Sequence, residues 1–438
     1  MVRQRHITQQ IIQTFDAQVT PIVKQMWSYT MLDLDLLSLR QGEWRSQRKR
    51  SRVEGVGEEL SLPNIDIEIK KNPQAYISTL RQKFQTSWES HNTVYGQWTQ
   101  QWLPGELDTQ WLLDSMSLEE KVAQLFIFWF DGTTLTEDEQ IFLQVYQPGG
   151  VIVMGKNVSP TLSQLIDEMQ ETQDKLPLFV SIDQEWWLVA RIAEQLPSQP
   201  EIQLDEICDV YTTRSDALHQ LGVNMNFGIV ADVTDNPNSF IYPRVFWWDV
   251  LAKISEATRC TQTTLSTLKH RPWHGGTALD THIGSARLTN NKSSREQADL
   301  PPFVSGVSAD ADLIMMWHLI ADHIDPDRPA TLSRSHQQFL RSSEGLWFDG
   351  LTVTDDMLMI SSDGDVTTQL QQALLAGHDL LLYVDLQDKQ KLLTSAIDMI
   401  RNGLITETEL DTRLRRIIEK KQKIISRDDV VPLELLAQ

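Results

Sequence analysis

The chain has 438 residues, of which 41% are hydrophobic and 23% are charged, a globular composition with room for one large domain and an appendage. Its formal net charge is −21, because 39 Lys and Arg residues stand against 60 Asp and Glu residues. This balance argues against a nucleic-acid or anionic-membrane binder. Residues 1–19 lack the apolar core of a signal peptide, and no apolar run is long enough to span a membrane. We therefore expect no membrane span and a cytoplasmic location.

The two cysteines, Cys208 and Cys260, are too few for a disulfide framework and have no metal-ligand spacing. We expect both to be buried free thiols, which is the usual state of isolated cysteines. No cofactor-binding motif accompanies them, so no metal and no cofactor is predicted.

Residues 1–110 differ from the remainder of the chain. Apolar residues at helical spacing between positions 11 and 26, and a second stretch over 73–102, predict a mainly helical extension. A basic run at 45–52 stands out in this acidic protein. It is interpreted either as a solvated loop or as a segment that docks to an acidic partner, such as a protein, or to a phosphate surface.

From residue 111 to residue 426, short apolar runs alternate with helical segments. Eight candidate strands are predicted, at 122–128, 150–154, 178–182, 223–230, 265–268, 313–316, 351–353 and 380–384. Near-continuous apolar strands separated by helices indicate a parallel sheet buried on both faces, and eight such units favour an α/β fold of the (β/α)₈ TIM-barrel type. The alternative is an open doubly wound sheet, but residues 130–134 after the first run hold no glycine-rich dinucleotide fingerprint. Residues 427–438 are taken as a tail.

Polar residues follow several of the predicted strands, where barrel chemistry is found. The set includes Asp183, Glu185, Arg244, Lys269, His270, Asp280, His282, His318, Asp355 and Asp356. A carboxylate at a strand end, a separate Asp-x-His and several cations suit glycosyl transfer through a covalent intermediate. Metal binding is the competing use of Asp and His, but no metal-ligand spacing occurs near these positions.

In these residues the sequence resembles glycoside hydrolase family 3, in particular its β-N-acetylhexosaminidase branch, over roughly residues 112–425. The most specific element is Lys-His-Arg-Pro-Trp-His-Gly-Gly-Thr at 269–277 followed by Asp-Thr-His at 280–282, which is similar to the branch's K-H-F-P-G-H-G loop and D-x-H dyad. Supporting elements lie at 149–152, 221–227, 329–333 and 348–356.

The resemblance implies a role for each matching position. Asp355 corresponds to the nucleophile, His282 to the acid/base and Asp280 to the residue that orients His282. The sugar-binding positions of the family correspond to Asp183, Arg191, Arg244, Lys269 and His270. A carbohydrate substrate is implied, with a peptidoglycan fragment as the expected class.

Tryptophans stand where the family has small residues or glycine. Seven of the 14 tryptophans flank motif positions: Trp186, Trp187, Trp247, Trp248, Trp273, Trp317 and Trp347. An indole in place of glycine strains a turn that needs positive φ. The indoles are interpreted as stacking platforms for sugars, as groups that fill the pocket and weaken turnover, or as packing outside it.

The sequence thus predicts a retaining β-N-acetylglucosaminidase. The alternatives are a catalytically silent barrel that binds a glycan or a protein, a β-glucosidase of the same fold, and phosphorolysis in place of hydrolysis.

Overall fold

The computed structural model describes residues 109–428, except 187, 193–195, 277–285, 289–298, 344 and 361–364. The predicted extension over 1–110 and the tail over 427–438 lie almost wholly outside the described residues and stay predictions. None of the described helices is both long enough and apolar enough to cross a membrane.

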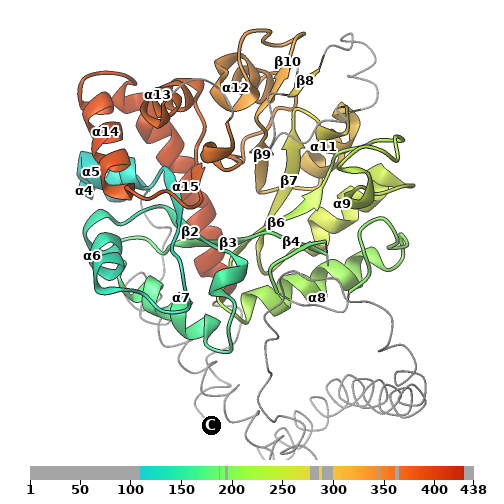
Figure 1. Cartoon of the computed structure of the whole chain (residues 1–438), viewed down its shortest axis with the longest axis horizontal. Helices are drawn as coiled ribbons and strands as arrows, with labels where there is room; N and C mark the ends of the chain where they lie inside the picture. The colour runs from blue at the N-terminus through green and yellow to red at the C-terminus, as the bar shows by residue number, and fades with distance from the viewer. Residues whose placement is uncertain are drawn as a thin grey trace, which may run out of the picture. The chain divides into compact units, whose positions relative to one another are not determined.

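The eight predicted strands form one parallel sheet, as expected, and the TIM-barrel prediction is confirmed (Figure 1). The strands are β1 (Phe126–Trp129), β2 (Gly150–Val153), β3 (Phe179–Ile182), β6 (Met225–Val230), β7 (Leu265–Arg271), β9 (Leu313–Met316), β11 (Leu351–Thr354) and β12 (Leu381–Tyr383). Their order is β11-β9-β7-β6-β3-β2-β1-β12, and a parallel bridge between Val353 and Leu380 joins the two edges. The sheet therefore closes on itself, which leaves no long open edge.

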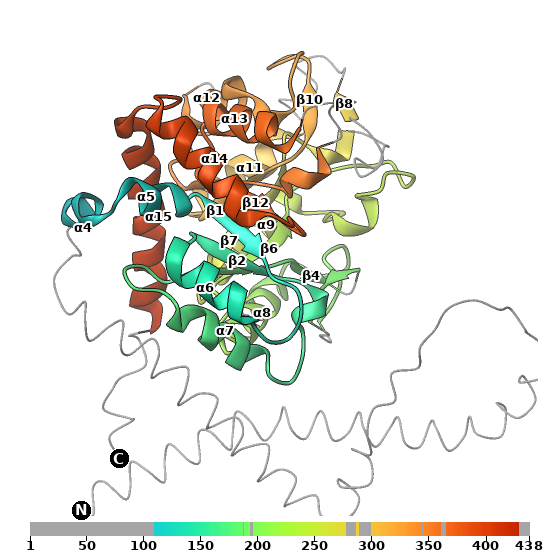
Figure 2. The same ribbon diagram turned by 60° about the vertical axis from the view of Figure 1, so that its left-hand side comes forward.

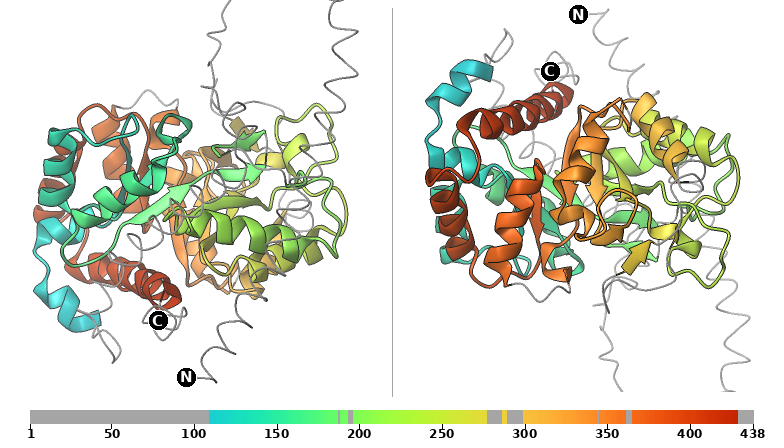
Figure 3. Two further views of the ribbon diagram at one scale, coloured as in Figure 1. Left: turned by 90° about the horizontal axis from the view of Figure 1, so that it is seen from below. Right: turned by 90° about the horizontal axis from the view of Figure 1, so that it is seen from above.

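Helices cover the outside of the barrel (Figure 3). They are α4 (Thr109–Ser115), α5 (Leu118–Ala123), α6 (Glu137–Tyr146), α7 (Leu162–Glu171), α8 (Ile207–His219), α9 (Val250–Cys260), α11 (Leu300–Ser308), α12 (Arg334–Arg341), α13 (Val366–Ala376), α14 (Lys389–Arg401) and α15 (Glu407–Asp428). All eight barrel strands are buried along their whole length. Burial on both faces explains why strands such as β1 (Phe-Ile-Phe-Trp), β2 (Gly-Val-Ile-Val) and β9 (Leu-Ile-Met-Met) are apolar runs without polar alternation.

Short additional elements follow the carboxyl ends of the strands. Beyond β3, β4 (Gln184–Trp186) pairs antiparallel with β5 (Val189–Ala190). Beyond β7, β8 (Ala286–Leu288) pairs parallel with β10 (Leu319–Ala321), which follows β9. The 3₁₀ turns are η1 (Gly155–Asn157), η2 (Tyr242–Arg244), η3 (His274–Gly276), η4 (Ala330–Leu332) and η5 (Met357–Met359). Two of these elements, β4 and η2, add the polar residues Glu185 and Arg244 to the carboxyl end of the barrel.

Cationic side chains of α15 hold the opposite, amino end of the barrel. The ammonium of Lys421 is buried and donates to the carbonyl oxygens of Gly149 (2.9 Å) and Pro177 (2.5 Å), just before β2 and β3. Lys420 pairs with Asp312 before β9 (3.0 Å). Figure 2 shows α15 running beside α4 and α5. One helix thus bonds to the starts of several strands.

Asp379 is the buried centre of another of these contacts. Its carboxylate accepts from Arg416 of α15 (2.6 Å), from Arg341 of α12 (2.7 Å) and from the backbone N–H of Thr352 (2.7 Å). Burial alone would raise the pKa of Asp379, but the two guanidinium groups outweigh it and lower that pKa. The carboxylate is therefore ionised and joins two helices to β11.

Replacing Asp379 by alanine is expected to lower the free energy of unfolding by about 3–5 kcal/mol, because two partly buried guanidinium groups lose their counter-ion. Urea unfolding followed by circular dichroism measures this change. Asp398→Ala is the matched control: its exposed carboxylate pairs with Arg401, and we expect a loss below about 1 kcal/mol. Equal losses in the two variants would contradict the assigned role of Asp379.

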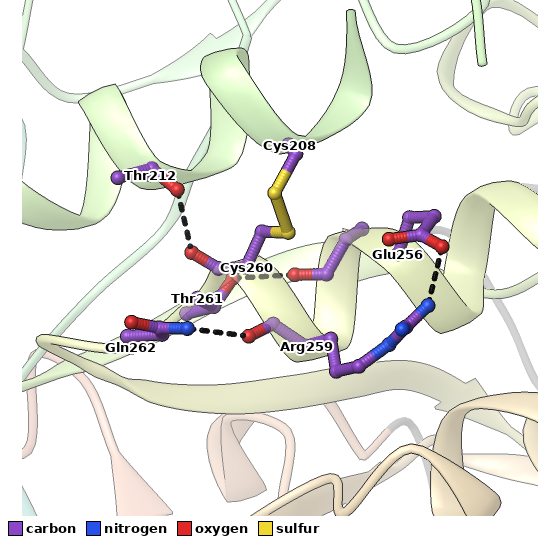
Figure 4. Close-up of a disulfide and its surroundings, with 8 residues drawn as sticks. Cys208, Thr212, Glu256, Arg259, Cys260, Thr261 and Gln262 are labelled. Carbon is purple, nitrogen blue, oxygen red and sulfur yellow. Dashed lines mark hydrogen bonds and ion pairs between the residues drawn. A yellow bond between two sulfur atoms is a disulfide. The ribbon is translucent and has the colours of Figure 1, made fainter. Parts of the chain in front are cut away.

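The prediction of two buried free thiols is wrong. Cys208 of α8 and Cys260 of α9 form a disulfide, with their Cα atoms 5.1 Å apart, and Cys208 is exposed (Figure 4). The two residues are 52 positions apart in the chain. Consecutive crossover helices pack side by side only after the barrel has formed, so their proximity leaves no spacing pattern to read.

Candidate active site

The carboxyl ends of β3, β6, β7 and β11 carry one buried cluster of charged residues. The structure brings together Asp183 after β3, Arg244 of η2, Lys269 and His270 of β7, and Asp355 after β11. These are five of the eight predicted site positions. Arg191, a sixth, follows β5 and donates to Asp183 at 2.9 Å.

Lys269 is the central cation of the cluster. Its fully buried ammonium lies 3.0 Å from Asp183 Oδ1 and 2.6 Å from Glu185 Oε1. Burial alone would raise the pKa of Asp183, but Lys269 and then Arg191 lower it below its ordinary range. Asp183 is therefore an ionised acceptor beside Asp355.

Glu185 belongs to the site, although its role was not predicted. Its carboxylate accepts two bonds from Arg244, Nε to Oε2 at 2.9 Å and Nη2 to Oε1 at 2.6 Å. Burial alone would raise the pKa of Glu185, but Arg244 and then Lys269 outweigh it and lower that pKa to about 2. A bidentate pair of this kind fixes the guanidinium in direction as well as in charge. The Asp-x-Glu spacing at 183–185 was the sequence signal for this role. Because β4 begins directly after β3, both carboxylates lie near the carboxyl end of β3.

Asp232 is a site residue that sequence reasoning missed. Its buried carboxylate accepts from His270 Nδ1 (2.6 Å), from the His270 backbone N–H (3.0 Å) and from the His274 backbone N–H (2.7 Å). Arg244 Nη2 lies 3.2 Å from His270 Nε2. A guanidinium can only donate, so Nε2 accepts and the imidazole proton is on Nδ1. Burial, and then Arg244, hold the pKa of His270 well below its usual value, so the ring is neutral.

Asp355 follows β11 and is half-buried beside the cluster. Its backbone N–H donates to Met316 O at 2.9 Å, and its Oδ1 accepts from the Asp356 N–H at 2.7 Å. Burial, then the negative charge of Asp183, raise its pKa to about 6, against the opposing charges of Lys269 and Arg244. The electrostatic coupling places Asp355 in the same site as the predicted sugar-binding residues.

The neighbouring carboxylate, Asp356, has a structural role. Its Oδ1 accepts from the backbone N–H groups of Leu358 (3.1 Å) and Val384 (3.0 Å), and its carbonyl accepts from His318 Nε2 at 2.7 Å. These bonds join β11 to η5, to the end of β12 and to His318 after β9. Of the two adjacent aspartates, Asp355 is thus the one available for chemistry.

Asp280 and His282 lie outside the described residues. Their roles as orienting residue and acid/base stay predictions, as does any contribution of Trp187.

The described tryptophans near the motifs fall into two groups. Trp186, Trp273 and Trp317 are buried, whereas Trp247, Trp248 and Trp347 are exposed. Trp273 has φ of 100°, as expected of a residue that replaces glycine in a turn, and its indole N–H donates to Asp299 O at 2.6 Å. The Trp317 ring lies edge-on to His270, with centroids 4.7 Å apart. The buried indoles are therefore part of the protein interior, and that of Trp317 contacts the site at His270.

Arg271 is a buried cation in an aromatic environment. Its guanidinium carbon lies 4.1 Å from the ring centre of Trp273 and 5.1 Å from that of Phe339. Its three guanidinium nitrogens make no hydrogen bond to any described residue. Burial lowers the pKa of Arg271 to about 9. Contacts with Trp273, Phe339 and, at 6.0 Å, Phe303 thus offset only part of the cost of a buried charge that has no counter-ion at hydrogen-bond distance in the described part of the chain.

Replacing Arg271 by phenylalanine, the residue type of the similar family motif, is expected to raise the free energy of unfolding by about 1–4 kcal/mol. The reason is that an apolar ring removes the cost of desolvating an unpaired charge. Thermal unfolding at pH 7 measures the change, and Arg259→Phe on the exposed face of α9 is the control for a general effect of the substitution. A destabilised Arg271→Phe variant would show that the guanidinium has a favourable partner.

The fold and the position of the charged cluster together define a (β/α)₈-barrel protein with its site at the carboxyl ends of the strands. The profile described as the glycosyl hydrolase family 3 N terminal domain matches residues 117–420. The chain therefore belongs to glycosyl hydrolase family 3, a glycosidase family, as the sequence motifs indicated.

Its relatives confirm the resemblance to the β-N-acetylhexosaminidase branch. The chain is 28% identical over 340 residues to "Beta-hexosaminidase A" of Pseudoalteromonas piscicida, covering 67% of this chain and 56% of that protein. It is 27% identical to "Beta-hexosaminidase LpqI" of Mycobacterium tuberculosis, covering 70% and 83%. A family 3 β-N-acetylglucosaminidase structure from Paenibacillus sp. str. FPU-7 superposes with a TM-score of 0.67 at 27% identity, covering 72% and 64%. The chain spans little more than half of the Pseudoalteromonas relative.

Proposed function

We propose that this protein is a retaining glycosidase that removes terminal β-linked N-acetylglucosamine. The observation that carries the proposal is the position of Asp355, whose half-buried carboxyl group follows β11 in the electrostatic field of Asp183, Lys269 and Arg244. The names of its relatives, β-hexosaminidase and β-N-acetylglucosaminidase, supply the sugar. A peptidoglycan fragment is the substrate class that the resemblance implies.

In the first step, Asp355 attacks the anomeric carbon while His282, oriented by Asp280, protonates the departing glycosidic oxygen. The C–O bond to the leaving group breaks as the ester bond to Asp355 forms, and the charge on the carboxylate is consumed. In the second step, His282 takes a proton from water, whose oxygen displaces Asp355 and releases the sugar with retained configuration. The neutral imidazole of His282 repels an anionic acceptor less than a carboxylate would, so phosphate is a second acceptor to test.

The charged cluster supplies donors and acceptors in fixed positions for sugar hydroxyls. Asp183 is ionised and held by Lys269 and Arg191, while the Asp232–His270–Arg244 chain fixes the tautomer of the imidazole. Groups held in this way need little reorganisation when substrate binds, which favours the transition state.

Wild-type protein is expected to release the chromophore from a p-nitrophenyl β-N-acetylglucosaminide, and faster than from the β-glucoside. Asp355→Ala is expected to reduce kcat by at least about a thousandfold, because the covalent step is lost. Asp131→Ala, which removes an exposed carboxylate after β1, is the matched control and should keep full activity. If the wild-type protein releases nothing but still binds the sugar, the silent-barrel alternative replaces the enzyme.

The pH dependence should report the ionisation of Asp355. The nucleophile acts as the carboxylate, and its pKa is raised to about 6, so kcat/KM should fall as the pH drops through 6. One unit below that pKa, about a tenth of the molecules hold the ionised form. Initial rates between pH 4.5 and 8 measure this acidic limb of the pH profile, in which kcat/KM falls as the pH decreases. In Asp355→Ala rescued by azide, the limb should be absent; its persistence there would assign it to another group.

The cytoplasmic location and the protein partner for residues 1–110 stay predictions from the sequence. The Cys208–Cys260 disulfide favours an oxidising compartment instead, because structural disulfides are rare in reducing cytosol.

A further inference from the structure

The loop between β6 and α9 carries five aromatic side chains within nine positions: Phe240, Tyr242, Phe246, Trp247 and Trp248, of which Phe246 is buried. We call residues 240–248 the aromatic segment; Figure 1 draws it in yellow-green ahead of α9. Phe240 is 41% exposed, Trp247 is 43% exposed and Trp248 is 45% exposed, in contrast to the buried Trp186, Trp273 and Trp317. Large apolar rings gathered on a surface mark a binding site more often than chance exposure does.

The rings of the aromatic segment are held in place. Tyr242 and Trp247 stack with centroids 5.8 Å apart, and the Trp247 indole N–H donates to the Tyr242 carbonyl at 3.4 Å. The Trp248 ring lies 5.8 Å from Trp247, and the Lys253 ammonium lies 5.1 Å from the Trp248 ring centre. The following helix, α9, is tied to α8 by its disulfide. Rings ordered before binding lose little conformational entropy when a ligand stacks on them.

The aromatic segment is continuous with the charged site. Arg244 lies within it and donates to Glu185 inside the cluster. The Arg244 guanidinium carbon is 5.9 Å from the Phe240 ring centre, and Phe240 stacks on His274 at 5.8 Å. The same nine residues thus extend from the cluster that contains Lys269 and His270 to the protein surface.

We infer that the aromatic segment binds the leaving-group side of an uncharged β-linked glycan, whose terminal sugar occupies the site beside Asp355. This inference rests on the proposed function. A pyranose ring presents C–H bonds on its face and hydroxyls on its edge, so it stacks on the negative face of an indole while its edge stays hydrated. The net charge of −21 favours an uncharged oligomer of N-acetylglucosamine on this segment over the peptidoglycan fragment that the resemblance implies, since the latter carries carboxylates. Continuity with a sugar site favours a glycan over a protein as the occupant.

Binding is tested with the β-1,4-linked tetrasaccharide of N-acetylglucosamine and full-length protein carrying Asp355→Ala, by isothermal titration calorimetry. Adding Trp247→Ala and Trp248→Ala is expected to raise Kd by about tenfold, because one or two aromatic contacts with the sugar are lost. Phenylalanine at both positions should restore most of the affinity. Trp347→Ala is the matched control, since this indole is 73% exposed and precedes β11 at the opposite end of the barrel.

In the protein with Asp355 intact, the readout is the ratio of kcat/KM for the tetrasaccharide to kcat/KM for the p-nitrophenyl monosaccharide. The double alanine variant should lower this ratio about tenfold, whereas Trp347→Ala should not change it. An unchanged ratio and unchanged Kd, with hydrolysis intact, would overturn this inference alone and leave the segment as a protein-contact surface. If the two alanine substitutions weaken binding of the tetrasaccharide but the wild-type protein hydrolyses neither compound, the proposed function alone is overturned.

Discussion

The arrangement of the site depends on one buried cation, the ammonium of Lys269. It lies within 3.0 Å of Asp183 and 2.6 Å of Glu185, so it joins β7 to the segment that follows β3. Removing three charges from water carries a large desolvation cost, which only close mutual contacts offset. The pairing therefore keeps both carboxylates ionised next to Asp355, where burial and then the negative charge of Asp183 raise the pKa of Asp355 to about 6.

The two ends of the barrel use buried charge for different purposes. At the amino end, cations of α15 bond to Asp312, Asp379 and backbone carbonyls at the starts of strands, and each contact joins a helix to the sheet. At the carboxyl end, the charged groups bond mainly to one another across neighbouring strands. Networks of the first kind hold the fold together, whereas the second kind presents aligned donors and acceptors to a ligand.

The tryptophans that distinguish this chain from the family pattern have no single role. Trp273 adopts positive φ and packs against Arg271, which also departs from the pattern, so the two changes form one local unit. The Trp317 ring packs edge-on against the His270 ring. Trp247 and Trp248 instead extend the site outward along the loop after β6. The buried tryptophans thus change the packing of the interior, whereas the exposed ones change the surface next to the site.

The sequence by itself determined the barrel, because eight apolar runs between helices leave few other ways to bury both faces of a sheet. It also predicted that Asp183, Lys269, His270 and Asp355 lie together, since strand ends of a parallel barrel meet at one rim wherever they lie in the chain. The resemblance to the family added Arg191. Only the tertiary structure decided that Glu185 holds Arg244 and that Asp232 joins the cluster. It alone also showed that Asp356 bonds to the backbone and that Cys208 pairs with Cys260. The physical reason is that these contacts depend on the angle and spacing between packed elements, and a linear pattern records the period of each element but not its distance from the others.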